Sequence, residues 1–474
     1  MFRYEKLILS KKILIILFGI ILFSFIQTIS PPKELSSQAW LVLGLLIIMA
    51  FWWLTEAIPL SITALLPLVI IPIFSDISIS EVAKPYSNPI IYLLLGGFVL
   101  GLGLQRSNLH KRLAIFVLLY IGYQRKNILA GFIISTAFLS MWLSNTATCL
   151  LMLPICLSVL TKLESEQDSL FRKILILSIA YSSSIGGMAT LIGTAPNAIF
   201  AGFMSENYNI DIDFSDWMMF SLPLVLLLIF LFWIFVSFFI RNEKIEKINS
   251  TIFLDEYKKL GKINLKEKVT MVIIFVTISL WIFKKNLNSF FGVSLTDSSI
   301  AIFGALLFFI IPIKRKFILD KSWFKYVPWN ILVLFGGGLS LAALISSTGL
   351  AGYISNSLYF FGKFDIFLII ISLALLISIM TEITSNTATT LLFLPIIVSF
   401  ALVHEYDIIK ITLPVVIAAS CAFMMPIATP PNAIAFSTNQ IKISFMASIG
   451  FFMNLSAVIL ASLWIYNFSF LLKY

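Results

Sequence analysis

The stretches FLSMWLSNTATCLLMLPI (138–155) and SIMTEITSNTATTLLFLPI (378–396) decide the fold of this 474-residue chain. Each contains the pentapeptide SNTAT, at 144–148 and again at 385–389, between two apolar arms with no charged loop between them. Apolar arms of about 14–18 residues suit a hairpin that enters and leaves a membrane on one side better than two full crossings. We therefore expect re-entrant hairpins over 127–160 and 366–403.

The neighbourhoods of the two pentapeptides repeat in the same order. In the first half, IIYLLLGGFVLGLGL (90–104) and an amphipathic stretch (109–122) precede the hairpin, and GTAPNAI (193–199) follows it. In the second half, NILVLFGGGLSLAAL (330–344), an amphipathic stretch (349–362) and ATPPNAI (428–434) take the same places. The nearly constant spacing predicts two copies of one structural unit.

The composition places this repeat in a membrane. Hydrophobic residues make up 59% of the chain and charged residues only 12%, about half the charged fraction of a soluble domain. The formal net charge of +10 lies in short loops and forms no basic face, so we expect no nucleic-acid partner. Eleven spans are predicted, at 12–29, 38–54, 57–74, 89–104, 174–205, 217–240, 269–285, 296–313, 330–346, 409–436 and 445–471.

The distribution of positive charge predicts the orientation. With the N-terminus in the cytoplasm, most of the 33 Lys and Arg residues fall in cytoplasmic segments, as the positive-inside rule requires. The C-terminus is then periplasmic. Five crossings separate equivalent points of the two copies, so the second copy is inverted, an architecture typical of secondary transporters.

The predicted organisation has four parts. An extra transmembrane helix (1–37) precedes the first repeat (38–240), a basic cytoplasmic loop (241–268) follows, and the second repeat completes the chain (269–474). The predicted fold class is an all-α polytopic membrane protein with about eleven transmembrane helices, two re-entrant hairpins and an inverted repeat.

The hairpin tips carry the expected chemistry. A tip breaks its helix, and unpaired backbone at membrane depth is tolerated only where it lines a cavity or is buried in protein. Ser144 and Ser385 suit the N-cap of each returning arm, whose amides and dipole favour a carboxylate. Freed carbonyls and hydroxyls suit a hard cation. Pro196, Pro430 and Pro431 should unwind the helices that follow the hairpins.

Neither the hairpin arms nor the proline breaks contain Lys or Arg. A dianion bound there would need countercharge from cations, which favours ion-coupled symport. Two acidic residues lie in apolar surroundings, Glu56 in WWLTEAIPL and Glu382 four residues before Asn386. Intramembrane carboxylates are candidates for function, but both residues lie near predicted helix ends, where a structural hydrogen-bonding role is equally compatible.

WWLTEAIPLSITALLP (52–67), the two SNTAT hairpins and the two Asn-Ala-Ile breaks resemble the divalent-anion/sodium symporter family of C4-dicarboxylate, citrate and sulfate carriers. The resemblance implies a homodimer in the bacterial inner membrane that works as an elevator, with sodium as the coupling ion and no other cofactor. The implied substrate-binding residues are Ser144, Asn145, Thr146, Thr194, Ser385, Asn386, Thr387, Thr429 and Pro430. The implied sodium sites are Ser140, Ser144, Asn145 and Gly193, and Thr381, Thr384, Asn386 and Ala428.

The leading hypothesis is sodium-coupled uptake of a C4-dicarboxylate such as succinate, malate or fumarate. The alternative is a sodium-independent exchanger of di- or tricarboxylates, or a citrate or sulfate carrier, of the same fold. We expect no enzymatic activity, because a hydrolase would need a nucleophile paired with a base. Neither His110 nor His404 lies inside a predicted span, and no spanning segment contains a pair of aspartates.

Overall fold

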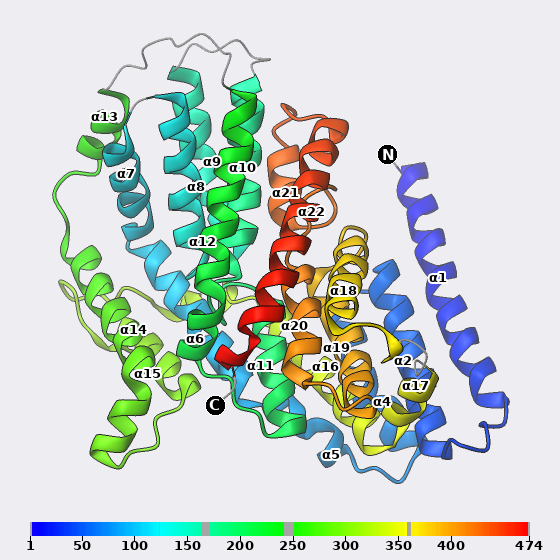
Figure 1. Ribbon diagram of the computed structural model, residues 1–474. Coiled ribbons are helices and arrows are strands. Elements are labelled where there is room, and N and C mark those ends of the chain that lie inside the picture. The colour runs from blue at the N-terminus through cyan, green and yellow to red at the C-terminus, as the bar shows by residue number, and fades with distance from the viewer. Residues whose placement is uncertain (1, 123, 163–169, 241–250, 358–361, 473–474) are drawn as a thin grey trace.

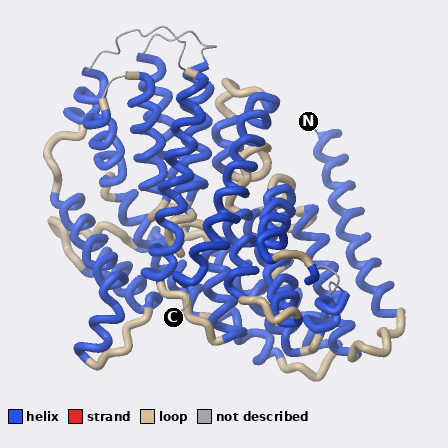
Figure 2. The backbone as a smooth tube through the Cα atoms, in the orientation of Figure 1, coloured by secondary structure: helices blue, strands red, loops and turns tan. Residues whose placement is uncertain are grey.

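The computed structural model describes residues 2–122, 124–162, 170–240, 251–357 and 362–472. Within these ranges the chain forms helices joined by loops and no β-strand (Figure 2). Seven of the described helical segments are long and apolar enough to cross a membrane, and further apolar helices of 10–17 residues accompany them. The prediction of an all-helical polytopic membrane protein is confirmed.

The first half begins with a helix that stands at the edge of the molecule and packs on its successor, α1 on α2 (Figure 1). The elements up to the first hairpin are α1 (Phe2–Thr28), α2 (Ser37–Thr55), α3 (Leu60–Thr63), α4 (Leu66–Phe74), α5 (Ile79–Ala83), η1 (Lys84–Ser87), α6 (Pro89–Arg106) and α7 (Leu109–Ile121). The amphipathic stretch predicted at 109–122 is α7.

The segment 57–74 differs from the single span predicted for it. It forms two short helices, α3 and α4, because Pro67 lies in the first turn of α4 and cannot donate the hydrogen bond that would continue α3. A second proline, Pro72, lies inside α4.

The two hairpins have the expected form. The first is α8 (Arg125–Ser140) and α9 (Asn145–Lys162), and the second is α18 (Ile366–Thr381) and α19 (Asn386–Val403). Figure 1 shows the first hairpin in the upper part of the molecule and the second in the lower part. Each returning arm begins at the asparagine of its SNT sequence.

The predicted spans 174–205 and 409–436 are both interrupted. The first consists of α10 (Leu170–Gly187) and α11 (Ala195–Tyr208), and the second of α20 (Ile408–Ala419) and α21 (Pro430–Phe436). The unwound segments, 188–194 and 420–429, precede the prolines, which occupy the first turns of α11 and α21. Proline fits a first turn because that position needs no N–H donor.

Two predictions for the middle of the chain differ from the structure. The predicted loop 241–268 contains a helix, α13 (Thr251–Lys259), although 241–250 lies outside the described residues. The span predicted at 269–285 is part of the longer α14 (Leu265–Phe291), so Lys284 and Lys285 lie within this helix and not in a loop beyond it.

The remaining helices complete the two copies. They are α12 (Phe214–Phe239), which ends the first half, α15 (Asp297–Ile310), α16 (Trp329–Ser347), α17 (Leu350–Ser357) and α22 (Ile443–Phe468). The amphipathic stretch predicted at 349–362 corresponds to α17, and its residues 358–361 lie outside the described residues. The order α6 to α12 matches the order α16 to α22, as an inverted repeat requires.

The helices pack mainly in two groups. The hairpins, the interrupted helices and the two helices that follow them form the first group, called the site helices: α8–α12 and α18–α22. The second group, called the frame helices, comprises α1–α6 and α14–α16. The short helices α7 and α17 join the frame to the first arm of each hairpin.

Helices of one copy pack against helices of the other. In the site helices, α11 packs on α19 and α21 packs on α9, so each short helix after a break covers the returning arm of the other copy's hairpin. In the frame, Gly96 of α6 approaches the backbone of Ala301, and Gly337 of α16 approaches the backbone of Ala64. These reciprocal contacts bring both SNT tips to the middle of the molecule.

Candidate functional site: a cavity between the two hairpin tips

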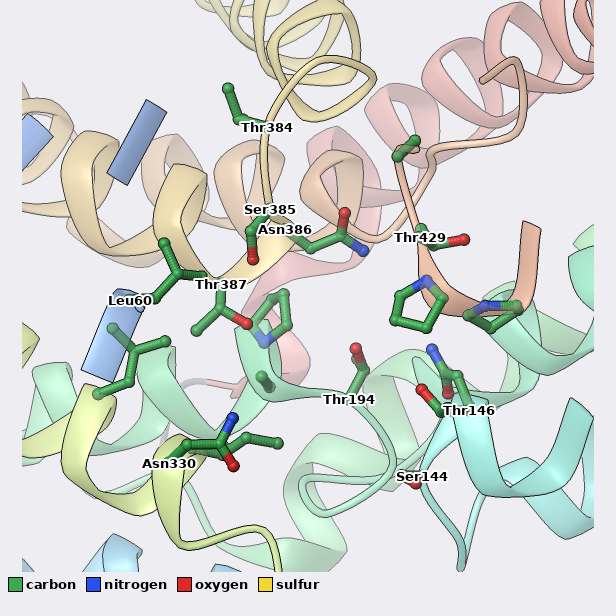
Figure 3. A pocket seen from close by; sticks show the side chains of 18 of the residues that line it. Leu60, Ser144, Thr146, Thr194, Asn330, Thr384, Ser385, Asn386, Thr387 and Thr429 are labelled. Carbon is green, nitrogen blue, oxygen red and sulfur yellow. The ribbon is translucent and has the colours of Figure 1, made fainter. Parts of the chain in front are cut away.

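A cavity of about 840 Å³ lies between the hairpin tips, the unwound segments and the frame. Figure 3 shows the polar side chains of both tips and of both unwound segments around it. The cavity brings together most of the residues expected from the sequence, namely Ser144, Asn145, Thr146, Gly193, Thr194, Thr384, Ser385, Asn386, Thr387, Ala428, Thr429 and Pro430. Ser140 and Thr381 are not among its lining residues and are buried behind the tips.

Helix N-termini surround this cavity. The returning arms α9 and α19 begin at the lining residues Asn145 and Asn386, while α11 and α21 begin directly after Thr194 and Thr429. Each helix start presents unpaired N–H groups and the positive end of its dipole. No Lys, Arg or His lines the cavity in the described part of the chain. The groups that this cavity offers to an anion are therefore backbone N–H groups, helix dipoles and hydroxyl groups.

The hydroxyl of Thr194 is available to a ligand. Thr194 holds the N-cap position of α11 but forms no side-chain cap bond. Its counterpart Thr429 accepts a hydrogen bond from Asn432 N at 3.3 Å and caps α21. The two equivalent threonines thus contribute differently to the cavity wall.

A cluster of oxygen atoms lies behind the first tip. The amide oxygen of Asn145 is 2.9 Å from Ser140 Oγ, 3.0 Å from Ser183 O and 3.3 Å from Gly193 O. Ser140 Oγ also lies 2.6 Å from Ser183 O, and its single proton cannot serve every contact. Turning the amide would place its NH₂ group among the same three oxygens. In that turned orientation the NH₂ group donates to all three oxygens, so it occupies the place that a hard cation would take among these hydroxyl and carbonyl ligands.

The second copy repeats this arrangement. Thr381 Oγ1 donates toward the amide oxygen of Asn386 at 2.6 Å and toward Ala419 O at 2.9 Å. Thr381, Asn386 and Ala419 thus correspond to Ser140, Asn145 and Ser183. The two carbonyl groups, of Ser183 and Ala419, were not predicted, because a backbone oxygen requires no particular side chain.

The side chain of Thr384 is turned away from this second cluster. Its hydroxyl donates to Met380 O at 2.9 Å and lies 2.5 Å from Thr389 Oγ1. The capping serines differ as well. Ser144 Oγ accepts from Ala147 N at 3.3 Å, as expected of an N-cap. Ser385 occupies the predicted N-cap position of α19, but its side chain forms no cap bond.

The asparagines of the two PNA sequences hold the unwound segments. Asn197 Nδ2 donates to the carbonyl oxygens of Gly187, Met188 and Thr190 at 3.3, 3.1 and 2.8 Å. Asn432 Nδ2 donates to those of Ala422 and Met425 at 3.0 and 3.1 Å. Buried carbonyl groups need such partners, so both asparagines are structural clamps, a role that the motif alone did not reveal.

Glu382 holds the second unwound segment. Its Oε1 accepts hydrogen bonds from Phe423 N and Met424 N at 2.7 and 2.8 Å, and its Oε2 accepts one from Met425 N at 2.9 Å. Asn454 Nδ2 of α22 donates to Oε1 at 2.7 Å. The sequence left open whether Glu382 has a functional or a structural role. The structure shows a structural role, because the carboxylate holds the backbone of residues 423–425.

The first unwound segment uses neutral partners instead. Thr190 Oγ1 donates to Met141 O at 2.6 Å, Trp217 Nε1 to Met188 O at 3.0 Å, and Ser221 Oγ to Ala189 O at 2.9 Å. The buried carboxylate therefore distinguishes the second copy from the first. The other acid, Glu56, lines the cavity with an exposed side chain at the end of α2.

Replacing Gly187 by alanine is expected to lower transport at least about tenfold. A Cβ atom there would meet the amide oxygen of Asn145 well inside van der Waals distance and would approach Gly193 O to 3.1 Å. Overpacking of this kind costs about 1–3 kcal/mol, and here it displaces groups of the oxygen cluster. Substrate uptake into liposomes that contain the purified protein measures the effect. Gly352→Ala is the matched control, since nothing lies within 4 Å of its added methyl group, and equal uptake by both variants would contradict the assignment.

Two inverted copies, paired hairpins and a central cavity that contains no basic side chain among the described residues define a secondary transporter. Residues 9–473 match the family model for the sodium:sulfate symporter transmembrane region. The chain belongs to this family.

Similar proteins include the sodium-dependent dicarboxylate transporters SdcS of Staphylococcus saprophyticus subsp. saprophyticus and of Staphylococcus aureus. Each is 36% identical over 467 residues, which cover 95% of this chain and 90% of the relative. Among solved structures, the YdaH transporter of Alcanivorax borkumensis is similar in fold, with a TM-score of 0.57 and 11% identity over 82% of this chain and 88% of that one.

Proposed function

We propose that this protein takes up C4-dicarboxylates such as succinate, malate or fumarate together with sodium ions. The observation that carries the proposal is the position of Asn145 and Asn386. Each begins a helix whose N-terminus faces the cavity, and the side chain of each belongs to an oxygen cluster suited to a cation. Relatives named as sodium-dependent dicarboxylate transporters support the same conclusion.

The proposed roles follow the geometry. The substrate carboxylates are held by hydroxyls, amides and helix N-termini at Ser144, Asn145, Thr146, Thr194, Ser385, Asn386, Thr387, Thr429 and Pro430. One sodium ion binds at the cluster of Ser140, Asn145, Ser183 O and Gly193 O, with Ser144 beside it. The other binds at Thr381, Asn386 and Ala419 O, near the backbone of Thr384 and Ala428.

These shared residues give a physical reason for coupling. Sodium bound at an oxygen cluster fixes the asparagine that begins the returning arm, and it supplies positive charge close to the anion. A dianion bound without sodium would rely on helix dipoles alone. Cation and anion therefore favour one another's binding, and by linkage the effect is reciprocal.

Transport requires the cavity to open alternately to the two sides of the membrane. We assign the movement to the site helices, which travel as one body along the frame helices in an elevator mechanism, with α7 and α17 as linkers. The protein acts as a homodimer in the bacterial inner membrane, with its N-terminus in the cytoplasm and its C-terminus in the periplasm. The uneven distribution of Lys and Arg supports this orientation.

Uptake of labelled succinate into proteoliposomes tests the function. We expect uptake driven by an inward sodium gradient to exceed, by about tenfold or more, the uptake measured when choline replaces sodium. Unlabelled malate and fumarate should compete, and liposomes without protein provide the control. Uptake that ignores sodium but requires dicarboxylate inside the vesicles would identify an exchanger and overturn the proposal.

A further inference from the structure

A buried lysine lies between the frame helices and the site helices at the end of the molecule where α11 meets α12. Lys284 of α14 forms an ion pair with Asp213, the N-cap residue of α12, and its Nζ lies 2.9 Å from Asp297 Oδ1 at the start of α15. Only 9% of the lysine side chain is exposed. A buried lysine needs such compensation, because its desolvation is costly.

The two carboxylates lie on different groups of helices. Asp297 belongs to the frame, as Lys284 does, whereas Asp213 belongs to the site helices. The seam between the groups contains a second link, because Phe214 N donates to Asp297 Oδ2 at 2.7 Å. The ring of Phe214 also stacks on Trp281 of α14, with centroids 4.1 Å apart. The ion pair is therefore the charged centre of a tight contact.

Further polar contacts cross the seam at the same end. Asn88 Nδ2, before α6, donates to Glu206 Oε2 of α11 at 2.7 Å. Lys285 Nζ lies 2.9 Å from Asp216 Oδ2 of α12 and 3.6 Å from Asp213 Oδ2. A cavity of about 590 Å³ is lined by Asn88, Asp213, Lys284, Lys285 and Asp297 among others. If the two groups of helices separated here, water would solvate the charged side chains that lost their partners. The free-energy cost of opening the seam would therefore be moderate.

The position of this network relates it to the cavity. The central cavity between the hairpin tips lies at the start of α11, and the polar groups around Lys284 lie near its end. About 20 Å of helix therefore separates the two. Another well-buried ion pair, Arg112 with Glu267, joins the linker α7 to α14 and does not involve the site helices. Only a movement of the site helices relative to the frame would separate Lys284 from Asp213.

We propose that Lys284 is a latch that holds the seam closed at this end while the cavity is open toward the other. The inference rests on the proposed alternating access. Buried ion pairs contribute little net stability compared with apolar packing, but they favour one of two arrangements of packed elements. Lys284 keeps Asp297 as a partner when the seam opens, so the buried lysine stays compensated while its pair with Asp213 is broken.

The charges of Lys284, Asp213 and Asp297 predict how substitutions at these positions shift the balance between the closed and the open seam. Asp213→Asn removes the attraction of Lys284 and Lys285 for Asp213 and leaves Lys284 compensated by Asp297. Lys284→Met is more disruptive, because two carboxylates then face each other across the seam and repel. Adding Asp213→Asn to Lys284→Met removes this repulsion, so the double variant should resemble Asp213→Asn alone.

Distance measurements between spin labels test the latch without any transport assay. Labels at Met219→Cys and Ser289→Cys, on exposed positions of α12 and α14, report the width of the seam. We expect Asp213→Asn to raise the ratio of open to closed populations about tenfold, and Lys284→Met to raise it further. Lys259→Met, which removes an exposed lysine from an ion pair within α13, should leave the ratio unchanged.

Each result decides the question. Distances in Asp213→Asn identical to those of the parent protein would overturn the latch, even if Lys284→Met failed to fold. A double variant as open as Lys284→Met would refute the role of the facing carboxylates. Because the labels report conformation directly, loss of succinate uptake in the parent would count against the proposed function and not against the latch.

Discussion

Uptake of succinate should fall about 100-fold or more when Asn145 or Asn386 is replaced by alanine. Each substitution removes an amide group from a proposed sodium site and a polar group from the cavity wall. An interaction with a charged group contributes about 1.5–3 kcal/mol, and the loss of two corresponds to a factor of 100 or more in the rate. The two variants should be similarly impaired because the clusters are equivalent.

The fold should survive these substitutions, since the main clamps of the unwound segments, Asn197, Asn432 and Glu382, remain in place. Melting in detergent separates binding from folding. Sodium should stabilise the parent by about 2.7 kcal/mol per site at a concentration of 100 Kd, and each variant should lose the contribution of its own site. Asn467→Ala, at an exposed position on α22, is the control. Normal uptake by either cluster variant would show that the SNT tips do not form the site.

Replacing Glu382 by leucine should destabilise the protein by on the order of 5 kcal/mol. The carboxylate is the acceptor for the amides of residues 423, 424 and 425 and for the side chain of Asn454. Each buried donor left without a partner costs about 1–3 kcal/mol. A loss of this size approaches the whole stability of many proteins, so the yield of folded protein should collapse, as size-exclusion chromatography would show.

A milder variant keeps this prediction testable if the leucine variant is not recovered. In Glu382→Gln the amide oxygen can replace Oε1, but the NH₂ group then faces Met425 N, so one hydrogen bond and the charge are lost. We expect a fold that melts at a lower temperature and binds sodium more weakly at the second cluster. Glu34→Leu, at an exposed position before α2, controls for the general effect of the substitution. A glutamine variant that melts with the parent would contradict the structural role of Glu382.

Much of the architecture could be predicted because it depends on local patterns. Apolar length identified the spans, and the repeated order of glycine pairs, SNTAT and PNA identified two inverted copies. The segment 57–74 was less predictable. Its apolar content resembled a span, whereas the restriction imposed by Pro67 divided it into α3 and α4. The end of α14 was also misplaced, because Lys284 reads as a loop residue unless its buried partners are known.

The sequence by itself determined where the helices break and which polar side chains stand at the breaks, since proline, glycine and SNT act on their own backbone. Only the tertiary structure decided which backbone carbonyls complete the oxygen clusters, Ser183 O and Ala419 O. It also decided that Glu382 holds the segment about Met424 and that Lys284 meets Asp213. The physical reason is the same in each case. The partners are distant in sequence, and a backbone group or a long charged side chain finds its partner only when the helices have packed.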